Sequence, residues 1–307
     1  MPTPYAVGPV NAYALPGDPF TLVDCGIDTL EARVALVDAF EAGGWDLADV
    51  RRILITHAHP DHYGLAGFVQ DRSGATVYFP RREIARVRDK QMLFEVGRLL
   101  LEAGMPLELL FKMDQQRRRG PRARVSDEVV PIDEGDVFDF DDGLRLNTLH
   151  MPGHTGGHVV FLDEAGGVMF AGDQLLPDVS PNPLLEPSLD EPGERRRSLQ
   201  EYLGSLERMR ALPLELAYPG HGDPIESPHA LIEWTIGHHL KRKVEIADHL
   251  TAEAKSPYVL AQELYPHVRE YDIFLAVSEV VAHLDLAVDD GLAVVERHDG
   301  VAVYRAA

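Results

Sequence analysis

The chain has 307 residues, of which 45% are hydrophobic and 26% are charged, a composition typical of a folded globular protein. Its 50 acidic and 29 basic side chains give a formal net charge of −21, which repels polyanions and argues against nucleic acid as a partner. The first twenty residues show no signal-peptide pattern, and no apolar run is long enough to span a membrane. We therefore expect a cytoplasmic protein without membrane contacts and, with Cys25 as its single cysteine, without an internal disulfide.

Strands and helices alternate in the first part of the chain. Residues 29–42 carry Leu30, Val34, Val37 and Phe40 at helical spacing, and Gly43-Gly44 ends the predicted helix. A second helix is expected at about 64–72. Short apolar runs predict strands at residues 10–15, 20–23, 53–56 and 76–79.

A long helical segment at residues 81–113 interrupts this alternation, and its apolar content exceeds what one amphipathic stripe needs. Such an insertion could form a lid or an apolar wall beside a substrate, and Met92 and Phe94 would then be the substrate-binding side chains. Alternatively, its helices pack on one another or on a second subunit.

Further strands are expected after the insertion, followed by a helix at 192–210 whose arginine triplet, Arg195-Arg196-Arg197, is solvated. The mixture of strands and helices predicts an α/β (α+β) fold, in which two mixed sheets form an αββα sandwich with the helices outside. These strands are expected near Val125, Val129, Val137, Leu144, Val159 and Val168.

The character of the chain changes after residue 227. Helices are expected at 228–250, 256–264 and 271–286, followed by a hairpin that turns at Asp299-Gly300. Three helices and a two-stranded wing resemble a winged-helix domain, so we expect a catalytic domain at 1–227 and a winged-helix-like domain at 228–307. Between Arg269 and Arg297 there is no lysine or arginine. This region therefore has the wrong charge for phosphate contacts, and a packing or dimerisation role is favoured over DNA binding.

The segment Thr56-His57-Ala58-His59-Pro60-Asp61-His62 places three histidines and one aspartate directly after an apolar run. Neutral imidazole and carboxylate are ligands for a borderline divalent ion such as Zn²⁺, and a turn lets side chains two residues apart converge. This segment predicts a metal site.

Further histidines and an aspartate follow three later apolar runs, each beside glycine. They lie in Pro152-Gly153-His154-Thr155-Gly156-Gly157-His158, in Ala171-Gly172-Asp173 and in Tyr218-Pro219-Gly220-His221-Gly222-Asp223-Pro224. Strands that lie side by side end at a common edge, so the four loops are expected to meet there.

These four motifs, in this order, closely resemble those of the metallo-beta-lactamase-fold hydrolase superfamily over about residues 5–230. The C-terminal region resembles the extension of a subgroup that includes an endoribonuclease group and several acyl hydrolases. The resemblance implies two metal ions, most simply Zn²⁺, with Mn or Fe as alternatives. The implied ligands are His57, His59 and His154 for the first ion, Asp61, His62 and His221 for the second, and Asp173 as the bridge between them.

Two metal ions that share a water lower its pKa, and the resulting bridging hydroxide can attack an acyl or phosphoryl centre at neutral pH. Asp61 is a candidate proton relay to the leaving group. Asp24 resembles the aspartate that orients a metal-bound histidine, although a strand-end cap is an equally good interpretation. Tyr63 could reach a substrate oxygen or simply pack beneath the loop.

The favoured function is dinuclear hydrolysis of a small acyl substrate, which could be a thioester, an ester or a lactone. A metal-dependent endoribonuclease fits the domain layout, but the negative charge argues against it. A single-iron persulfide oxygenase is a lesser alternative, because the motif does not fix the metal. A non-enzymatic assembly module would not need a complete ligand set. A homo-oligomer is compatible with each of these functions.

Overall fold

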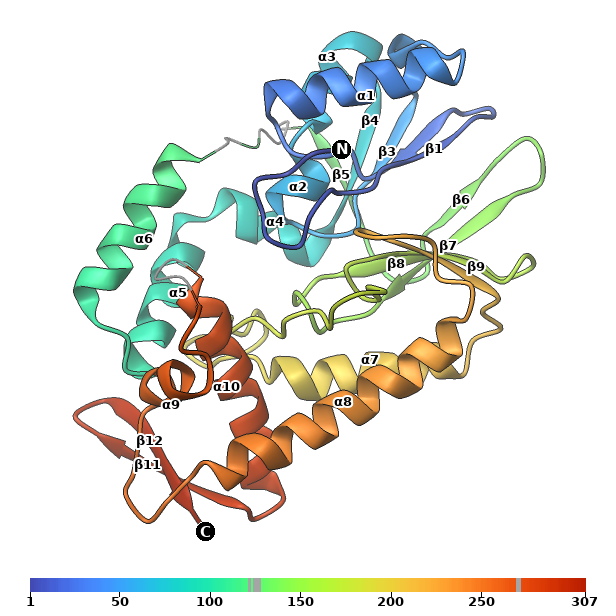
Figure 1. Cartoon of the computed structure of the whole chain (residues 1–307). Coiled ribbons are helices and arrows are strands. Elements are labelled where there is room, and N and C mark those ends of the chain that lie inside the picture. The colour runs from blue at the N-terminus through green and yellow to red at the C-terminus, as the bar shows by residue number, and fades with distance from the viewer. Residues whose placement is uncertain (121–122, 124–127, 269–271) are drawn as a thin grey trace.

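Two five-stranded mixed sheets face each other at the centre of the molecule (Figure 1). We describe them from a computed structural model, which places residues 1–120, 123, 128–268 and 272–307. In the first sheet β1 is antiparallel to β2, and the other neighbours are parallel; its strands are β1 (Tyr13–Leu15), β2 (Thr21–Val23), β3 (Arg52–Leu54), β4 (Thr76–Pro80) and β5 (Val129–Ile132).

The second sheet has the order β10-β9-β8-β7-β6, and its β10–β9 pair is parallel while the others are antiparallel. Its strands are β6 (Val137–Asp139), β7 (Arg145–His150), β8 (Val159–Asp163), β9 (Val168–Gly172) and β10 (Leu216–Pro219). The strand expected near Val125 falls outside the described residues.

Apolar side chains of both sheets fill the space between them, among them Val23, Leu54, Phe161 and Phe170. Helices α1 (Leu30–Ala42) and α3 (Ala66–Ser73) cover the outer face of the first sheet. Helices α7 (Ser198–Arg210) and α8 (Pro228–Asp248) cover the outer face of the second. The predicted αββα sandwich is confirmed.

Helix α1 has the predicted ends but a different buried face. The Thr29 side chain accepts a hydrogen bond from the Ala32 N–H and begins the helix. The buried residues are Ala32, Leu36 and Phe40, while Leu30 and Val34 are at least half exposed. Of the four apolar residues at helical spacing, Phe40 is buried and Val37 packs partly against the core.

Helix α7 begins later than expected, at Ser198. The expectation that the preceding arginine triplet is solvated is wrong at Arg196, which is buried between the carboxylates of Glu186 and Glu201. Arg195 pairs with Asp285 on helix α10 (Ile273–Asp289). These two arginines therefore fix the segment before α7 to the Glu186 segment and to α10.

The insertion forms three helices, α4 (Arg81–Arg88), α5 (Lys90–Glu102) and α6 (Leu107–Arg119). The chain turns between α5 and α6 at Gly104, whose φ of 90° favours glycine. The short helices η1 (Leu47–Asp49) and α2 (Pro60–Tyr63) complete the elements of this half of the chain.

The C-terminal region contains the expected helices and hairpin. Helices α8, α9 (Pro257–Leu264) and α10 precede strands β11 (Ala293–His298) and β12 (Val301–Ala306). The hairpin turns at Asp299 and Gly300, both with positive φ, as an Asp-Gly turn requires. Tyr271, where the last helix was expected to begin, lies outside the described residues. The division into domains at 1–227 and 228–307 stays a prediction.

The insertion and the C-terminal region share one hydrophobic core, and α5 lies next to α10 in Figure 1. Leu100 and Leu109 of the insertion belong to the same buried cluster as Leu260 and Val277. The Tyr258 N–H donates to the Ala103 carbonyl at 3.0 Å. The insertion helices therefore pack on the C-terminal region of the same chain, an arrangement that the sequence did not indicate. Within the described part of the chain, no helix is both long and apolar enough to cross a membrane.

This shared core predicts effects of different size on the free energy of unfolding for two leucines on α5. Leu100→Ala empties a buried position and should lower the free energy of unfolding by about 2–5 kcal/mol. Leu93→Ala is the matched control, because Leu93 is 46% exposed, and should change it by about 0.5 kcal/mol or less. Urea unfolding at fixed metal concentration measures both values. Equal values for the two variants would contradict the shared core.

Candidate metal centre

The four motif loops lie at strand ends along one edge of the sandwich. The segment from His57 to His62 follows β3, and the loop with His154 follows β7. Asp173 directly follows β9, and His221 comes two residues after β10. Side chains that are far apart in sequence thereby meet between the two sheets.

Seven side chains form two groups in which the potential ligand atoms lie within 4.8 Å of one another. The first contains His57, His59, His154 and Asp173, and the second contains Asp61, His62 and His221. In the first group, His59 Nδ1 lies 3.0 Å from His57 Nε2 and 2.9 Å from His154 Nε2. In the second, His221 Nε2 lies 3.3 Å from Asp61 Oδ2. All seven side chains that the motifs predicted are brought together.

Asp173 lies between the two groups. Its Oδ1 is 3.3 Å from His62 Nε2, and its Oδ2 is 3.6 Å from His154 Nε2 and 3.7 Å from His221 Nε2. Burial alone would raise its pKa, but the surrounding imidazoles, with His62 foremost, hold the pKa of this carboxyl well below its usual range. One ionised carboxylate therefore faces both groups.

The donors present fit divalent cations. His62 Nε2, Asp173 Oδ1 and His221 Nε2 are buried without a hydrogen-bond partner. Unpaired buried polar atoms are costly, and a positive charge placed between these three would stabilise them. Burial and neighbouring imidazoles lower the pKa values of His57 and His59 well below the usual histidine value, which leaves their lone pairs free. Bound divalent ions would satisfy all of these atoms.

The outer nitrogens of these histidines are held by the protein. His154 Nδ1 lies 3.1 Å from the Asn182 carbonyl oxygen, and His221 Nδ1 lies 2.8 Å from the Pro9 carbonyl oxygen. His62 Nδ1 lies 2.8 Å from Asp24 Oδ2. Such contacts fix the ring orientation and direct the other nitrogen toward the metal.

Asp24 joins two parts of the ligand loop. Besides contacting His62, its carboxylate accepts hydrogen bonds from the Thr56 N–H at 2.9 Å and from the Thr56 hydroxyl at 2.8 Å. Its φ of 54° is unusual for a residue other than glycine, so these contacts hold the backbone in a strained conformation. This geometry fits the role of orienting His62 better than that of a simple strand-end cap.

Aromatic side chains lie beside the second group. Tyr63 is buried against the edge of the Phe79 ring. Tyr5 lies near Asp61 and Tyr63; burial, followed by these two groups, raises its pKa to about 12. The sequence analysis missed Tyr5, because a tyrosine in an irregular N-terminal segment carries no pattern.

The insertion also reaches the site, but not through the predicted side chains. Glu83 and Arg86 on α4 touch the ligand loops, and Arg86 Nη2 lies 3.1 Å from His59 Nε2. The sequence analysis missed both residues. Met92 is half buried on α5, and Phe94 on the same helix is 66% exposed. Neither belongs to the two ligand groups. Substrate contact by Met92 and Phe94 stays a prediction.

Other histidines have structural partners. His158 Nε2 accepts a hydrogen bond from the Asp173 N–H at 3.2 Å, a loop contact of the kind expected. His239 Nδ1 and His283 Nε2 lie 3.1 Å apart, and their outer nitrogens lie 2.7 Å from the Ser180 hydroxyl and 2.8 Å from the Glu279 carbonyl oxygen. Since every ring nitrogen of this buried pair has a partner, the pair joins α8 to α10.

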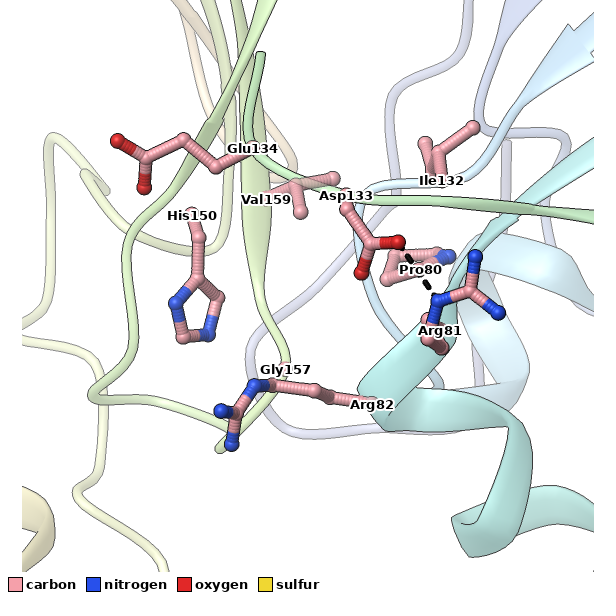
Figure 2. Close-up of a pocket in the computed structure, with 9 residues that line it drawn as sticks. All are labelled: Pro80, Arg81, Arg82, Ile132, Asp133, Glu134, His150, Gly157 and Val159. Carbon is pink, nitrogen blue, oxygen red and sulfur yellow. Dashed lines mark hydrogen bonds and ion pairs between the residues drawn. The ribbon is translucent and has the colours of Figure 1, made fainter. Parts of the chain in front are cut away.

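A cavity of about 220 Å³ is lined by His150 and Gly157, on either side of His154 in sequence, and by the start of α4 (Figure 2). The ion pair of Arg81 with Asp133 crosses one side of it at 2.6 Å, and Arg82 and His150 line the other. Gly157 is the member of its wall that belongs to a ligand loop. This cavity therefore borders the loop that carries His154, but none of the seven ligand candidates lines it.

A two-sheet sandwich with this cluster at its strand ends defines a metal-dependent hydrolase, and the comparisons with known proteins give its family. The chain belongs to the metallo-beta-lactamase superfamily, whose family model matches residues 5–221. It is 34% identical to the probable metallo-hydrolase YqjP of Bacillus subtilis over 93% of this chain and 90% of that protein. A metallo-beta-lactamase family protein of Thermus thermophilus, TTHA1429, has a similar structure, with a TM-score of 0.85, 31% identity and coverage of 100% and 97% of the two chains.

The chain is also 27% identical to a hydroxyacylglutathione hydrolase of Rhizobium meliloti, over 67% of this chain and 60% of that protein. The match to YqjP extends over both the catalytic motifs and most of the remaining chain, whereas this second match is partial.

Asp24→Asn should weaken metal binding. Asparagine has one acceptor oxygen where aspartate has two, so its amide group must face either the Thr56 N–H or the His62 Nδ1–H. The loss of such a supporting contact typically lowers metal affinity about 10–100-fold. Competition with a chromophoric chelator measures the affinity. Asp28→Asn is the control, since Asp28 pairs with Arg33 outside the centre. Unchanged affinity in the Asp24 variant would contradict the assigned role.

Glu279 should make stability depend on pH. Burial raises its pKa to about 7, which Arg242 nearby only partly offsets. Because the folded pKa lies above the unfolded value of 4.5, the stabilisation is complete below that value and is lost progressively as pH rises to about 7. The stability of Glu279→Gln relative to the parent should therefore rise by about 1–3 kcal/mol between pH 4 and pH 8.

Urea unfolding of both proteins at the two pH values tests this prediction, with the exposed Glu253→Gln as the control. A stability difference that does not change between the two pH values would show that Glu279 does not titrate in this range.

Proposed function

We propose that this hydrolase holds two metal ions and cleaves a small acyl substrate, with a thioester as the first choice and an ester or a lactone as the alternatives. The observation that carries the proposal is the position of Asp173, with one carboxylate oxygen facing His62 and the other facing His154 and His221. A site for a single ion would not need a carboxylate shared between two donor groups.

The donor set favours zinc. Nitrogen and oxygen donors without a cysteine suit Zn²⁺, and Mn or Fe accept similar ligands. When bound, two such ions supply a bridging hydroxide at neutral pH and a Lewis acid for the substrate oxygen. The protein's own part is to orient the donors, through Asp24 and the carbonyl groups of Asn182 and Pro9.

Residues of the second group have two further proposed roles. Asp61, 3.3 Å from His221 Nε2 and little exposed, is the proposed proton carrier to the leaving group. Tyr63 and Tyr5, next to it, are the proposed contacts to a substrate oxygen, because phenols with raised pKa values stay protonated and can donate.

Two arguments select an acyl substrate. The partial relative from Rhizobium meliloti is named for an acyl derivative of glutathione, which is a thioester. The net charge of −21 opposes a polyanion, so the endoribonuclease is the second candidate. We propose that residues 228–307 support the insertion and take part in any self-association, without contacting nucleic acid.

The test compares one preparation, stripped of metal and reloaded with Zn²⁺, Mn²⁺ or Fe²⁺, on a hydroxyacyl thioester of glutathione, the corresponding ester and lactone, and a labelled single-stranded RNA. We expect metal-dependent thioester cleavage that falls more than about 100-fold in His59→Ala. His249→Ala is the matched control, because His249 is exposed and belongs to neither ligand group, and it should retain full activity.

Two results would overturn the proposal. RNA cleavage that is lost in His59→Ala, without thioester cleavage, would establish the nuclease. Oxygen consumption on a persulfide by the iron-loaded protein alone would establish the persulfide oxygenase, and a bound metal content near one ion per chain would agree with it.

A further inference from the structure

Helix α4 places one buried carboxylate between the two loops of the first ligand group. Glu83 is 2% exposed in a helix that is otherwise rich in arginine. Its Oε2 accepts from the Ala58 N–H at 3.2 Å, and its Oε1 accepts from the Gly157 N–H at 2.6 Å. Ala58 lies between His57 and His59, and Gly157 is three residues after His154. A single side chain therefore joins the backbones that carry all three imidazoles.

A second buried carboxylate contacts the loop that carries His154. Glu186 is 6% exposed and accepts from the Gly156 N–H at 3.3 Å and from Arg196 Nη1 at 2.5 Å. Arg196 Nη2 donates to the Gly153 carbonyl at 3.2 Å, and Arg86 forms an ion pair with Glu186. These buried charges are paired with one another and with peptide groups, which is the condition under which burial is tolerated.

The two glycines after His154 are explained by these contacts. A Cβ atom at Gly157 would lie 2.8 Å from both Cγ and Oε1 of Glu83, and one at Gly156 would lie 3.0 Å from the Arg196 side chain. Because neither glycine has a side chain, the Glu83 carboxylate and the Arg196 guanidinium can approach the loop backbone closely.

We propose that Glu83 is a positioning residue, which fixes the spacing between the His57–His59 loop and the His154 loop so that three imidazole nitrogens converge on one ion. The inference rests on the proposed dinuclear function. None of the contacts of Glu83 involves a ligand atom, so it acts through the backbone and not as a ligand. The insertion then has a role at the metal centre that is separate from that of a lid.

Glu83→Gln tests the proposal with a side chain of the same shape. Both carboxylate oxygens accept from N–H groups, so the amide of glutamine must direct its own N–H groups at one of these donors. We expect the affinity for one of two Zn²⁺ ions to fall about 10–100-fold, and the visible absorption of the Co²⁺-loaded protein to change. Arg81→Gln is the matched control, because Arg81 lies on the same helix as Glu83 and its ion pair with Asp133 is exposed to solvent.

Gly157→Ala provides an independent variant, because the added methyl group would lie 2.8 Å from both Arg82 Cβ and Glu83 Cγ and must push the start of α4, with Glu83, away from the loop while the carboxylate charge remains. It should reproduce the loss of Zn²⁺ affinity. In the double variant the losses should not add, since both changes break the same contact. Thermal unfolding of the metal-free proteins shows whether each variant is folded, and a folded Gly157→Ala keeps the test valid if Glu83→Gln does not fold.

Wild-type Zn²⁺ affinity and an unchanged Co²⁺ spectrum in a folded Glu83→Gln would overturn the proposal, as would additive losses in the double variant. Thioester turnover is measured separately. A positioning role predicts a lower kcat with a nearly unchanged KM for the acyl substrate. If no thioester is cleaved by the parent protein but Zn²⁺ affinity still depends on Glu83, the proposed function fails while the positioning role stands.

Discussion

The convergence of imidazole nitrogens at contact distance is the constraint on which the rest of the molecule depends. His59 Nδ1 lies within about 3 Å of nitrogens from both His57 and His154, distances at which neutral rings can share a proton but only a cation can accept all three lone pairs at once. Holding three such rings together away from water costs free energy. The surrounding fold must therefore hold the ligand loops in place against this unfavourable free energy. The hydrogen bonds that do so are made where the ligand loops follow the strands.

Three kinds of support meet this cost. Backbone carbonyls at Asn182 and Pro9 orient two rings, and the Asp24 carboxylate orients a third. Buried carboxylates at Glu83 and Glu186 hold the peptide groups of the loops themselves. The two sheets supply a rigid frame, since their inner faces are packed with large apolar side chains. The site is thus placed on strand ends and fixed by groups that are distant in sequence.

The ligand candidates could be predicted from the sequence because each lies in a short motif beside a strand-like run, where local spacing carries the information. The sandwich could be predicted for the same reason. The supporting residues could not. Pro9 and Asn182 act through their backbones, which leaves no trace in residue type, and Glu83 resembles any glutamate on a charged helix. The one available signal was Gly156-Gly157, since adjacent glycines after a ligand indicate that another group approaches the backbone.

Errors in the sequence analysis have a common physical origin. Leu30 and Val34 of α1 are exposed although they share helical spacing with the buried Phe40, and Arg196 was expected in solvent although Glu186 and Glu201 pair with it away from water. Which of these side chains is covered depends on how the elements pack in the assembled fold. Charged residues next to a functional site are therefore the poorest candidates for a default surface assignment.

The core shared by the insertion and the C-terminal region has a consequence for modularity. Leu100 and Leu109 are covered by side chains from α9 and α10, so deletion of either segment would leave a wet apolar face on the other. The two segments, separated by more than a hundred residues of chain, form one packed unit. A chain that carries α4 to α6 without the helices after residue 227 would need another cover for that apolar face.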